Sequence, residues 1–389
     1  MSGPFDLIVQ DGNVVLPDEV RRLDIGIRDG KITALADRLE PGPGGGVLSA
    51  EGKWILPGVI DAHVHLNEPG LGGWEGFATG SAALAAGGCT TYIDMPLNGR
   101  PPTVNTEAFK LKLSVAEGAS CIDYALWGGL VPGNGDQLAA LAEAGAAGFK
   151  AFMSDPGGEG EDIFREVDDL TLYEGMKRIA SMGGILALHA ESEALVSALS
   201  EERKRSGRTG PMDYVSSRPV VAELEAVNRA LFYAGQTGCA LHFVHISSPQ
   251  AVQAIAVAKR QGMDVTAETC PHYLILTCDD LMEIGPATKC APPLRTRAEQ
   301  DGLWEAVASG AIDLIASDHS PCPAELKRHT DWFQAWGGIA GAQHTLELML
   351  HEGHLRRGIP LTRITTVAVG AARPPFRLIP PKRGYSRRL

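Results

Sequence analysis

The amino-acid sequence predicts an α/β protein, in which a (β/α)8 TIM-like barrel follows a small N-terminal β-sandwich domain. Two observations support this fold class. Short, partly alternating segments separated by Asp-Gly pairs precede any helical segment, and eight short apolar runs then alternate with Ala/Leu/Glu-rich segments. Strict alternation of strands and helices favours a parallel sheet, and eight repeats favour closure of that sheet into a barrel.

The N-terminal β domain is expected to begin the chain. Asp-Gly pairs between its segments are typical of tight hairpin turns, and the stretch PGPGGG at 41–46 then breaks the strand pattern. We therefore assign residues 1–52 to this domain. Its strands are predicted at 5–9, 13–16, 22–28 and 31–36.

The barrel is expected over residues 53–370. Segments such as FATGSAALAAG and VVAELEAVNRALFYAG are long enough for the helices between its strands. In barrels of this kind the chemistry lies at the carboxyl ends of the strands. The eight strands are predicted within 54–65, 89–96, 121–127, 147–153, 184–190, 239–246, 264–270 and 311–317.

Composition limits the partners and the compartment. A formal net charge of −12 over 389 residues argues against a nucleic-acid partner, because such proteins usually present a basic face. The seven cysteines include no C-x-x-C pair, which favours reduced thiols. We find neither the pattern of a signal peptide nor an apolar run of about 18 residues, the length of a membrane span. The sequence therefore predicts a cytoplasmic protein with a small-molecule substrate and no membrane partner.

Several candidate metal ligands lie at the ends of predicted strands. His63 and His65 are two residues apart, so their side chains leave the first strand on the same face. Alone, such a pair also occurs as two hydrogen-bonded histidines. Four imidazoles and a carboxylate, however, exceed what one tetrahedral ion with an open position needs, so we expect two divalent ions. The remaining candidates lie in the fourth, fifth and sixth runs and just after the eighth: Lys150, His189, His245 and Asp318.

Lys150 does not fit a metal centre as an ordinary ammonium, which has no lone pair and is repelled by divalent cations. It must be modified or lie elsewhere. The whole ligand pattern resembles the binuclear amidohydrolase superfamily, in which this lysine is carboxylated by CO2. The resemblance implies that a carbamate on Lys150 bridges the two ions, most simply Zn²⁺, with Co, Mn, Fe and Ni as alternatives.

Longer motifs resemble those of the allantoinases within that superfamily. Dihydroorotases share much of the pattern but typically carry an arginine, which holds a substrate carboxylate, at the position of Asn67. A neutral residue there favours an uncharged ureide such as allantoin, because a buried carboxylate without a cation is costly. The motifs are HVHLNEPG (63–70), WEGFATGSAALAAGGCTTYIDMPLN (74–98), KCAPPLR (289–295), SDHSPCPAELK (317–327) and WGGIAGAQ (336–343).

The resemblance implies hydrolysis of the cyclic amide bond of allantoin to allantoate. A metal-bridging hydroxide would attack, with Asp318 as both metal ligand and general acid/base. Asn67, Asn98, Ala291, Gly337 and Gly338 are expected to contact the substrate. The alternatives are a hydantoinase or dihydropyrimidinase, a dihydroorotase or, from another class, an inactive scaffold relative that has lost metal ligands. A homotetramer is also implied.

Two features depart from the family pattern. Allantoinases commonly carry Arg-Thr after the Glu-Pro-Gly motif, where this chain has Leu71-Gly72. Family members also continue after the barrel with strands that complete the β-sandwich, whereas this chain ends in PPFRLIPPKRGYSRRL. We therefore expect residues 371–389 to be an atypical tail, truncated or frameshifted. The C-terminal part of the sandwich would then be missing, and a strand edge would be exposed.

Overall fold

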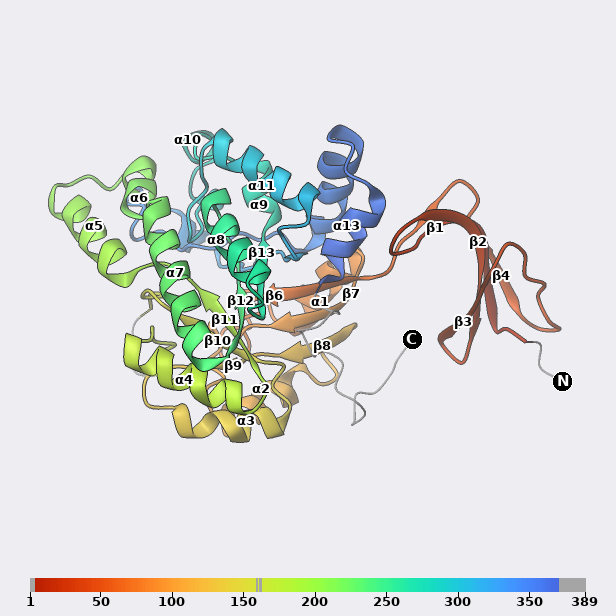
Figure 1. Cartoon of the computed structure of the whole chain (residues 1–389), viewed down its shortest axis with the longest axis horizontal. Coiled ribbons are helices and arrows are strands. Elements are labelled where there is room, and N and C mark those ends of the chain that lie inside the picture. Colours follow the sequence, from red (N-terminus) through yellow and green to blue (C-terminus); the bar gives the residue numbers. More distant parts are fainter. Residues whose placement is uncertain (1–3, 159, 161–162, 371–389) are drawn as a thin grey trace.

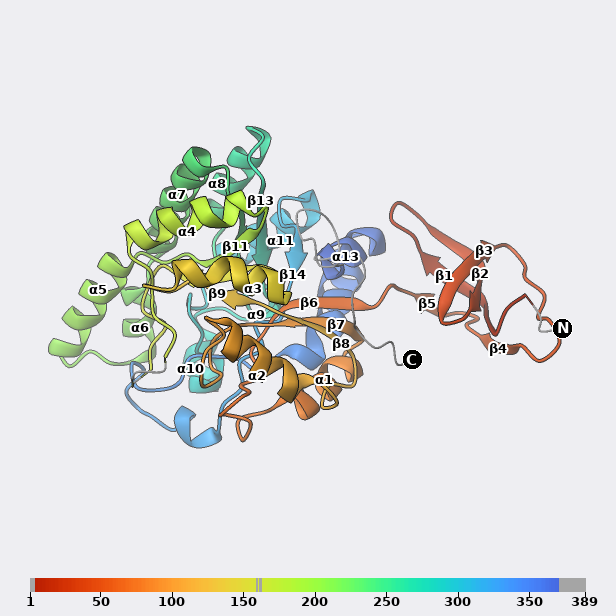
Figure 2. The ribbon, with the colours of Figure 1, turned by 90° about the horizontal axis from the view of Figure 1, so that it is seen from below.

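The computed structural model of the chain describes residues 4–370, apart from 159, 161 and 162. The predicted tail at 371–389 therefore lies outside the described residues. A small β-sheet occupies one end of the elongated molecule, and the barrel with its helices occupies the other (Figure 1). The chain passes from the small sheet directly into the first barrel strand (Figure 2).

The small sheet has five strands in the order β3-β2-β1-β4, with β5 pairing with β1 beyond β4. β1 pairs antiparallel with β2, and β2 pairs antiparallel with β3. β4 and β5 run parallel to β1. The strands are β1 (Leu7–Val15), β2 (Val20–Arg28), β3 (Lys31–Ala36), β4 (Gly46–Ser49) and β5 (Trp54–Ile55).

The Asp-Gly pair at 11–12 is not the turn that the sequence led us to expect. The segments 5–9 and 13–16 form one strand, and its pairing with β2 shifts register between Val9 and Gly12. Asp11 has φ 61°, so the pair makes a bulge within β1. The second pair, Asp29-Gly30, does form the predicted hairpin turn, with both residues at positive φ.

The first barrel strand is shorter than predicted. Trp54 and Ile55 pair with β1, so they belong to the small sheet, which therefore extends beyond residue 52. Gly12 permits this arrangement, because a Cβ there would lie 2.2 Å from the Ile55 side chain.

Each of the eight predicted barrel runs contains a parallel strand, and the predicted fold class is confirmed. The strands form two hydrogen-bonded groups, β6-β7-β8 and β9 to β14, and the chain crosses from β8 to β9 through Trp127. They are β6 (Val59–Val64), β7 (Cys89–Asp94), β8 (Asp123–Leu126), β9 (Gly128–Gly129), β10 (Phe149–Phe152), β11 (Ile185–His189), β12 (Ala240–Phe243), β13 (Val265–Thr269) and β14 (Leu314–Ile315).

The last and first strands meet just beyond their regular parts. An isolated parallel bridge joins Val64 to His319, and the His65 N–H donates to the His319 carbonyl at 2.7 Å. This contact closes the barrel beside two of the predicted metal ligands.

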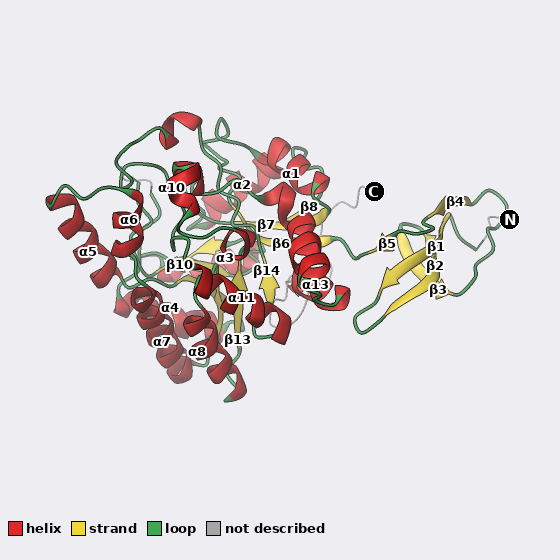
Figure 3. Ribbon diagram, turned by 90° about the horizontal axis from the view of Figure 1, so that it is seen from above, coloured by secondary structure: helices red, strands yellow, loops and turns green. Residues whose placement is uncertain are grey.

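Helices surround the strands (Figure 3). Side chains of Asn105, Asp168 and Ser248 cap α2, α4 and α8 at their N-termini. The helices are α1 (Phe77–Ala86), α2 (Thr106–Ala116), α3 (Leu138–Ala144), α4 (Asp169–Ser181), α5 (Glu193–Arg205), α6 (Pro211–Ser217), α7 (Val220–Thr237), α8 (Pro249–Arg260), α9 (Pro271–Ile275), α10 (Asp280–Ile284), α11 (Arg297–Ser309), α12 (Thr345–Leu348) and α13 (Leu361–Ala368). Short 3-10 segments are η1 (Gly135–Gln137), η2 (Pro286–Thr288), η3 (Ala324–Lys327) and η4 (Ala342–His344), and η5 (Met349–Arg356) is a π-helix.

The two faces of the barrel strands pack into two apolar clusters. On β11, Leu186 and Leu188 belong to the larger cluster, which includes helical residues, and Ile185 and Ala187 belong to the smaller one. Because alternate residues of a strand share a face, the His189 side chain points to the same inner face as Ile185 and Ala187. It lies at the end of β11, at the mouth of the barrel. Among the described residues, no helix has the length and apolar character needed to cross a membrane.

Candidate active site

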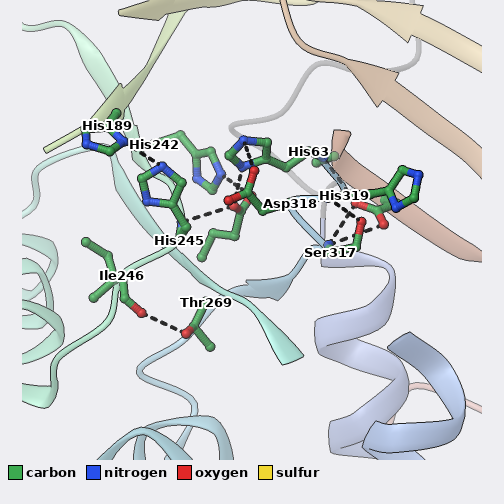
Figure 4. Close-up of polar contacts among 12 residues, drawn as sticks. His63, His189, His242, His245, Ile246, Thr269, Ser317, Asp318 and His319 are labelled. Atoms are coloured by element: carbon green, nitrogen blue, oxygen red, sulfur yellow. Dashed lines mark hydrogen bonds and ion pairs between the residues drawn. The ribbon is translucent and has the colours of Figure 1, made fainter. Parts of the chain in front are cut away.

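The six predicted metal ligands lie at the ends of five different strands. Asp318 follows β14 and contacts the histidines of β6: its Oδ1 lies 3.1 Å from His63 Nε2 and 3.3 Å from His65 Nε2. His63 and His65 therefore do leave the strand on one face. The remaining ligands come from β10, β11 and the segment after β12, and Figure 4 shows how most of the cluster is arranged.

The second half of the cluster contains His189, His245 and Lys150. His189 Nδ1 faces His245 Nε2 at 3.0 Å. The Lys150 side chain is fully buried, and its Nζ has no hydrogen-bond partner among the described residues. It lies 4.9 Å from the centre of the Phe152 ring, and that ring stacks on His189.

Two of these ligands have backbone conformations that L-residues rarely adopt. His245 has φ 39° and Asp318 has φ 47°. Each residue follows a strand directly or closely, so the left-handed backbone turns its side chain away from the path of the strand. Such strain costs of order 1–3 kcal/mol per residue and is concentrated at functional sites.

The unsatisfied atoms of the cluster fit a metal centre. Ligand atoms of His63, His245 and Asp318 lie within 4.8 Å of one another. His65 Nδ1, His245 Nδ1 and Lys150 Nζ are buried without a hydrogen bond to any described residue, a condition that costs free energy unless another group compensates. Imidazole and carboxylate donors are those that zinc and its neighbours prefer.

The protonation states also suit metal ligands, which must be deprotonated. Burial lowers the pKa of His65, His189 and His245, so these imidazoles are neutral. Burial opposes ionisation of Asp318, but His63 and a hydrogen bond from His65 hold its pKa well below the ordinary value. Burial also lowers the pKa of Lys150 to about 7.

Buried carboxylates that the sequence analysis did not identify orient these imidazoles. Glu268 on β13 accepts hydrogen bonds from His63 Nδ1 at 2.8 Å, from His245 N at 3.1 Å and from His242 Nε2 at 3.0 Å. Because an ionised carboxylate only accepts, the proton of His63 must lie on Nδ1, and the lone pair of Nε2 points toward Asp318. Burial opposes ionisation, yet the adjacent histidines lower the pKa of Glu268 to about 2.

Glu191 does the same for His189. It accepts from His189 Nε2 at 2.8 Å and is paired with Arg218, so the Nδ1 of His189 is left to face His245. Asp61 on β6 accepts from the backbone N–H of Ser317 at 3.1 Å and thereby fixes the residue before Asp318. The sequence signal is an acid inside a strand for Glu268 and Asp61, and an acid just after a strand for Glu191, because a buried carboxylate requires partners.

A cavity opens beside the cluster, with an empty volume of about 1050 Å³ when the solvent at its mouth is included. That space admits a small cyclic ureide. Four of the residues expected to contact the substrate line it: Asn98, Ala291, Gly337 and Gly338. Its lining also includes Leu71, the edge-to-face pair Trp74 and Trp336, and the cations Arg100 and Arg218.

Asn67 is placed differently from our expectation. It is 1% exposed, does not line the cavity, and donates through Nδ2 to the Pro321 carbonyl at 3.1 Å. Its φ of 66° directs the side chain into the neighbouring loop. In this geometry Asn67 supports the wall of the cavity and does not contact its contents.

Comparisons with known proteins show the family of the chain. The family model described as "Dihydro-orotase-like" matches residues 52–251. The allantoinase of Deinococcus radiodurans is 49% identical over 380 residues, covering 98% of this chain and 84% of that protein. The allantoinase of Solibacter usitatus is 50% identical over 366 residues, covering 94% and 79%.

Solved structures show the same architecture. An L-hydantoinase (dihydropyrimidinase) from Arthrobacter aurescens superposes with a TM-score of 0.88 at 36% identity, covering 94% of this chain and 80% of that one. A D-hydantoinase from a Thermus species gives 0.87 at 29% identity, covering 96% and 82%. Because allantoinases at 49–50% identity cover 94–98% of it, the chain belongs to the allantoinase family of dihydro-orotase-like cyclic amidohydrolases.

Proposed function

We propose that this protein hydrolyses the cyclic amide bond of allantoin to give allantoate. The observation that carries the proposal is the meeting of four imidazoles, Lys150 and Asp318 at the mouth of a cavity sized for a small ring. Identity to allantoinases, at 49–50%, exceeds the 36% to the hydantoinase of known structure and favours allantoin over a hydantoin. The complete ligand set argues against an inactive scaffold.

The six ligands would hold two divalent ions, which we propose are Zn²⁺: His63, His65, Lys150, His189, His245 and Asp318. Lys150 would bridge the ions as a carbamate. Two observations support this modification: its Nζ is buried without a partner, and its pKa of about 7 leaves much of it as the neutral amine that reacts with CO2. When bound, the ions supply Lewis acidity for the scissile carbonyl and ionise water near neutral pH.

Asp318 is the residue we assign to proton transfer. Its Oδ1 contacts His63 and His65, and its other carboxylate oxygen has no hydrogen bond to any described residue. Asp318 also lines the cavity, so this oxygen can accept a proton from the attacking water and deliver it to the leaving ring nitrogen. Its low pKa keeps it ionised and ready to accept.

Backbone groups are suited to recognise the ring. A cyclic ureide alternates N–H and C=O groups along its edge. The backbone N–H and C=O of Ala291 and of Gly337 make no hydrogen bond to any described residue, and both residues line the cavity. Each can therefore donate to a ring carbonyl and accept from a ring N–H, and Asn98 offers an amide side chain beside them.

The proposal is tested by assaying purified, metal-analysed protein against allantoin, hydantoin, dihydrouracil and dihydroorotate in parallel. We expect close to two ions per chain and the highest kcat/KM for allantoin. A preference of about tenfold or more for another substrate, equivalent to about 1.4 kcal/mol in the barrier, would overturn the allantoin assignment. Full activity in protein that contains only trace metal would overturn the proposal of a metal centre.

We also propose a cytoplasmic location and a homotetramer. All seven cysteines are free thiols and most are buried, which suits a reducing compartment. The tetramer rests on the family resemblance, and light scattering of the purified protein measures it directly.

A further inference from the structure

Two lysines contact the backbone of the cavity wall at residues 335–338, which we call the wall segment. Lys289 Nζ donates to the Ala335 carbonyl. Lys327 Nζ donates to the Trp336 carbonyl at 2.9 Å and to the Gly338 carbonyl at 2.6 Å. Three of the four carbonyls of the wall segment therefore accept hydrogen bonds from lysine amino groups.

Neither lysine forms a salt bridge with a described carboxylate, although both lie in a poorly solvated region. Lys289 is 5% exposed, and its Nζ lies 4.6 Å from the centre of the Tyr214 ring. Burial and neighbouring cations lower its pKa to about 7, and burial also lowers the pKa of Lys327. Placing two lysine amino groups here, with no carboxylate to balance their charge when they are protonated, is unfavourable, so stability alone does not account for them.

The contacts leave one residue of the wall segment with unpaired backbone groups. The Trp336 N–H donates to the Leu326 carbonyl at 2.9 Å, and the Gly338 N–H donates to the Lys289 carbonyl at 2.8 Å. Only Gly337 has both its N–H and its C=O without a hydrogen bond to a described residue. A Cβ on Gly337 would meet nothing within 4 Å, which places it against the open cavity.

The lysines also polarise the two peptide units that flank Gly337. Lys327 binds the carbonyl of the Trp336–Gly337 peptide, whose N–H belongs to Gly337, so this N–H becomes a stronger donor. The Gly338 N–H is bound by the Lys289 carbonyl, so the Gly337 carbonyl in the same peptide becomes a stronger acceptor.

Lys289 connects the wall segment to the neighbouring segment that contains Ala291. It lies two residues before Ala291, whose neighbour Cys290 is held through its carbonyl by the Tyr214 hydroxyl at 2.9 Å. The side chain of Lys289 reaches the wall segment, and its own carbonyl accepts from Gly338. The separation of the Ala291 and Gly337 edges is thereby fixed.

We propose that Lys289 and Lys327 are positioning residues for substrate recognition, which occupy the other carbonyls of the wall segment so that Gly337 alone presents free, polarised backbone groups to the ring. This inference rests on the proposed function, because it takes Ala291 and Gly337 as the edges that bind a cyclic ureide. The two lysines fix the distance between the Ala291 and Gly337 edges, and this distance determines which ring fits between them.

The test compares metal-loaded Lys327→Met and Lys289→Met with wild type and with Lys259→Met. Lys259 is a matched control, because it is a partly buried lysine that is paired with Asp313 at 2.6 Å and has no hydrogen bond to the wall segment. KM and kcat are measured with allantoin and with hydantoin. Hydrogen exchange of residues 334–340 is measured without substrate, together with metal content and Tm.

We expect Lys327→Met and Lys289→Met each to raise KM about tenfold or more, as loss of a bond to a charged group would, while kcat changes less than about threefold. Hydrogen exchange in the wall segment should become faster while the protein keeps two ions per chain. Lys327→Arg keeps the positive charge and should have a KM close to that of the wild type. Lys259→Met should lower Tm and leave KM unchanged. If Lys289→Met does not fold, the comparison of Lys327→Met with Lys327→Arg still tests the positioning role.

The inference is overturned if Lys327→Met keeps KM within about twofold of wild type, or if it lowers Tm without faster exchange in the wall segment, as a merely structural lysine would. A wild-type enzyme that turns over hydantoin and not allantoin contradicts the proposed function instead. In that case the exchange data, and KM for hydantoin, still test the two lysines.

Discussion

Glu268→Gln removes the charge from the side chain that orients two proposed metal ligands, with almost no change in shape. Glu268 accepts from His63 Nδ1, His245 N and His242 Nε2, so its negative charge fixes which nitrogen of His63 carries the proton. The lowest-energy placement of glutamine keeps its oxygen toward His63 and His245. The amide NH2 then faces His242, which must change tautomer to accept from it.

The expected magnitude follows from these contacts. Hydrogen bonds to a charged group contribute about 1.5–3 kcal/mol and neutral ones about 0.5–1.5 kcal/mol. Loss of the charge therefore weakens the hydrogen bond between residue 268 and His63 by roughly 1–1.5 kcal/mol. This corresponds to about a tenfold loss of metal affinity, the lower end of the 10–100-fold typical of residues that orient metal-binding histidines. Glu268→Ala removes the contacts as well and should approach the upper end.

The assay is competition between apo-protein and a chromophoric chelator for Zn²⁺, followed by kcat at saturating metal. Glu268→Gln should weaken zinc binding while its kcat at saturation falls much less. Glu223→Gln is the matched control: Glu223 is also buried and accepts from Ser247 and Ser248, and among the described residues it has no hydrogen bond to an imidazole of the cluster. If both variants bind zinc within about twofold of wild type, Glu268 has no orienting role and the reasoning fails.

Three further outcomes are expected. Because the pKa of Lys150 is about 7, its amine is mostly protonated near pH 6 and mostly neutral near pH 8, so bicarbonate should promote zinc uptake by apo-protein more at the higher pH. Lys150→Ala should show no such bicarbonate effect, and persistence of the effect in that variant would exclude the carbamate. Asp318→Asn should lower kcat by at least about 100-fold, and a variant that keeps a tenth of wild-type kcat would exclude the proton-transfer role. Arg100 lines the cavity with no described partner, so Arg100→Ala should raise KM for allantoin, which carries a ureido arm, more than for hydantoin; equal increases would contradict this contact.

Periodicity predicted the parts of the site that depend on strand geometry. Side chains two apart on a strand share a face, and the carboxyl ends of parallel strands meet at one mouth, so His63, His65, His189 and Asp318 could be brought together from sequence. The structure places Asp318 against both histidines of β6. These inferences succeed because backbone geometry alone determines them.

Loop conformation could not be predicted in the same way. Asn67 follows the first strand by position, but its φ of 66° turns the side chain toward Pro321. Asp11 likewise precedes a glycine as a turn residue would, yet strand pairing with β2 continues past it. Asp and Asn adopt left-handed backbone in turns and in bulges alike, so the residue type does not decide between them.

The buried acids illustrate a third case. Glu268 lies within the seventh predicted run, and it binds His63 across 205 positions of sequence. Glu191 directly follows the fifth run and binds the nearby His189, but its second partner, Arg218, comes from beyond α6. The sequence signals that such an acid needs compensation, but only the closed barrel shows which group provides it.

The bridge between Val64 and His319 has a consequence for assembly of the enzyme. The proposed ligands on the first strand meet the aspartate after the last strand at this seam, so metal binding and completion of the barrel are thermodynamically linked. At a free zinc concentration a hundredfold above its dissociation constant, each site would add about 2.7 kcal/mol to the free energy of unfolding. A nascent chain in which β14 has not yet been synthesised contains the four histidines and the lysine but lacks Asp318, so its proposed metal site is incomplete. The complete metal centre would therefore form only after the barrel has closed.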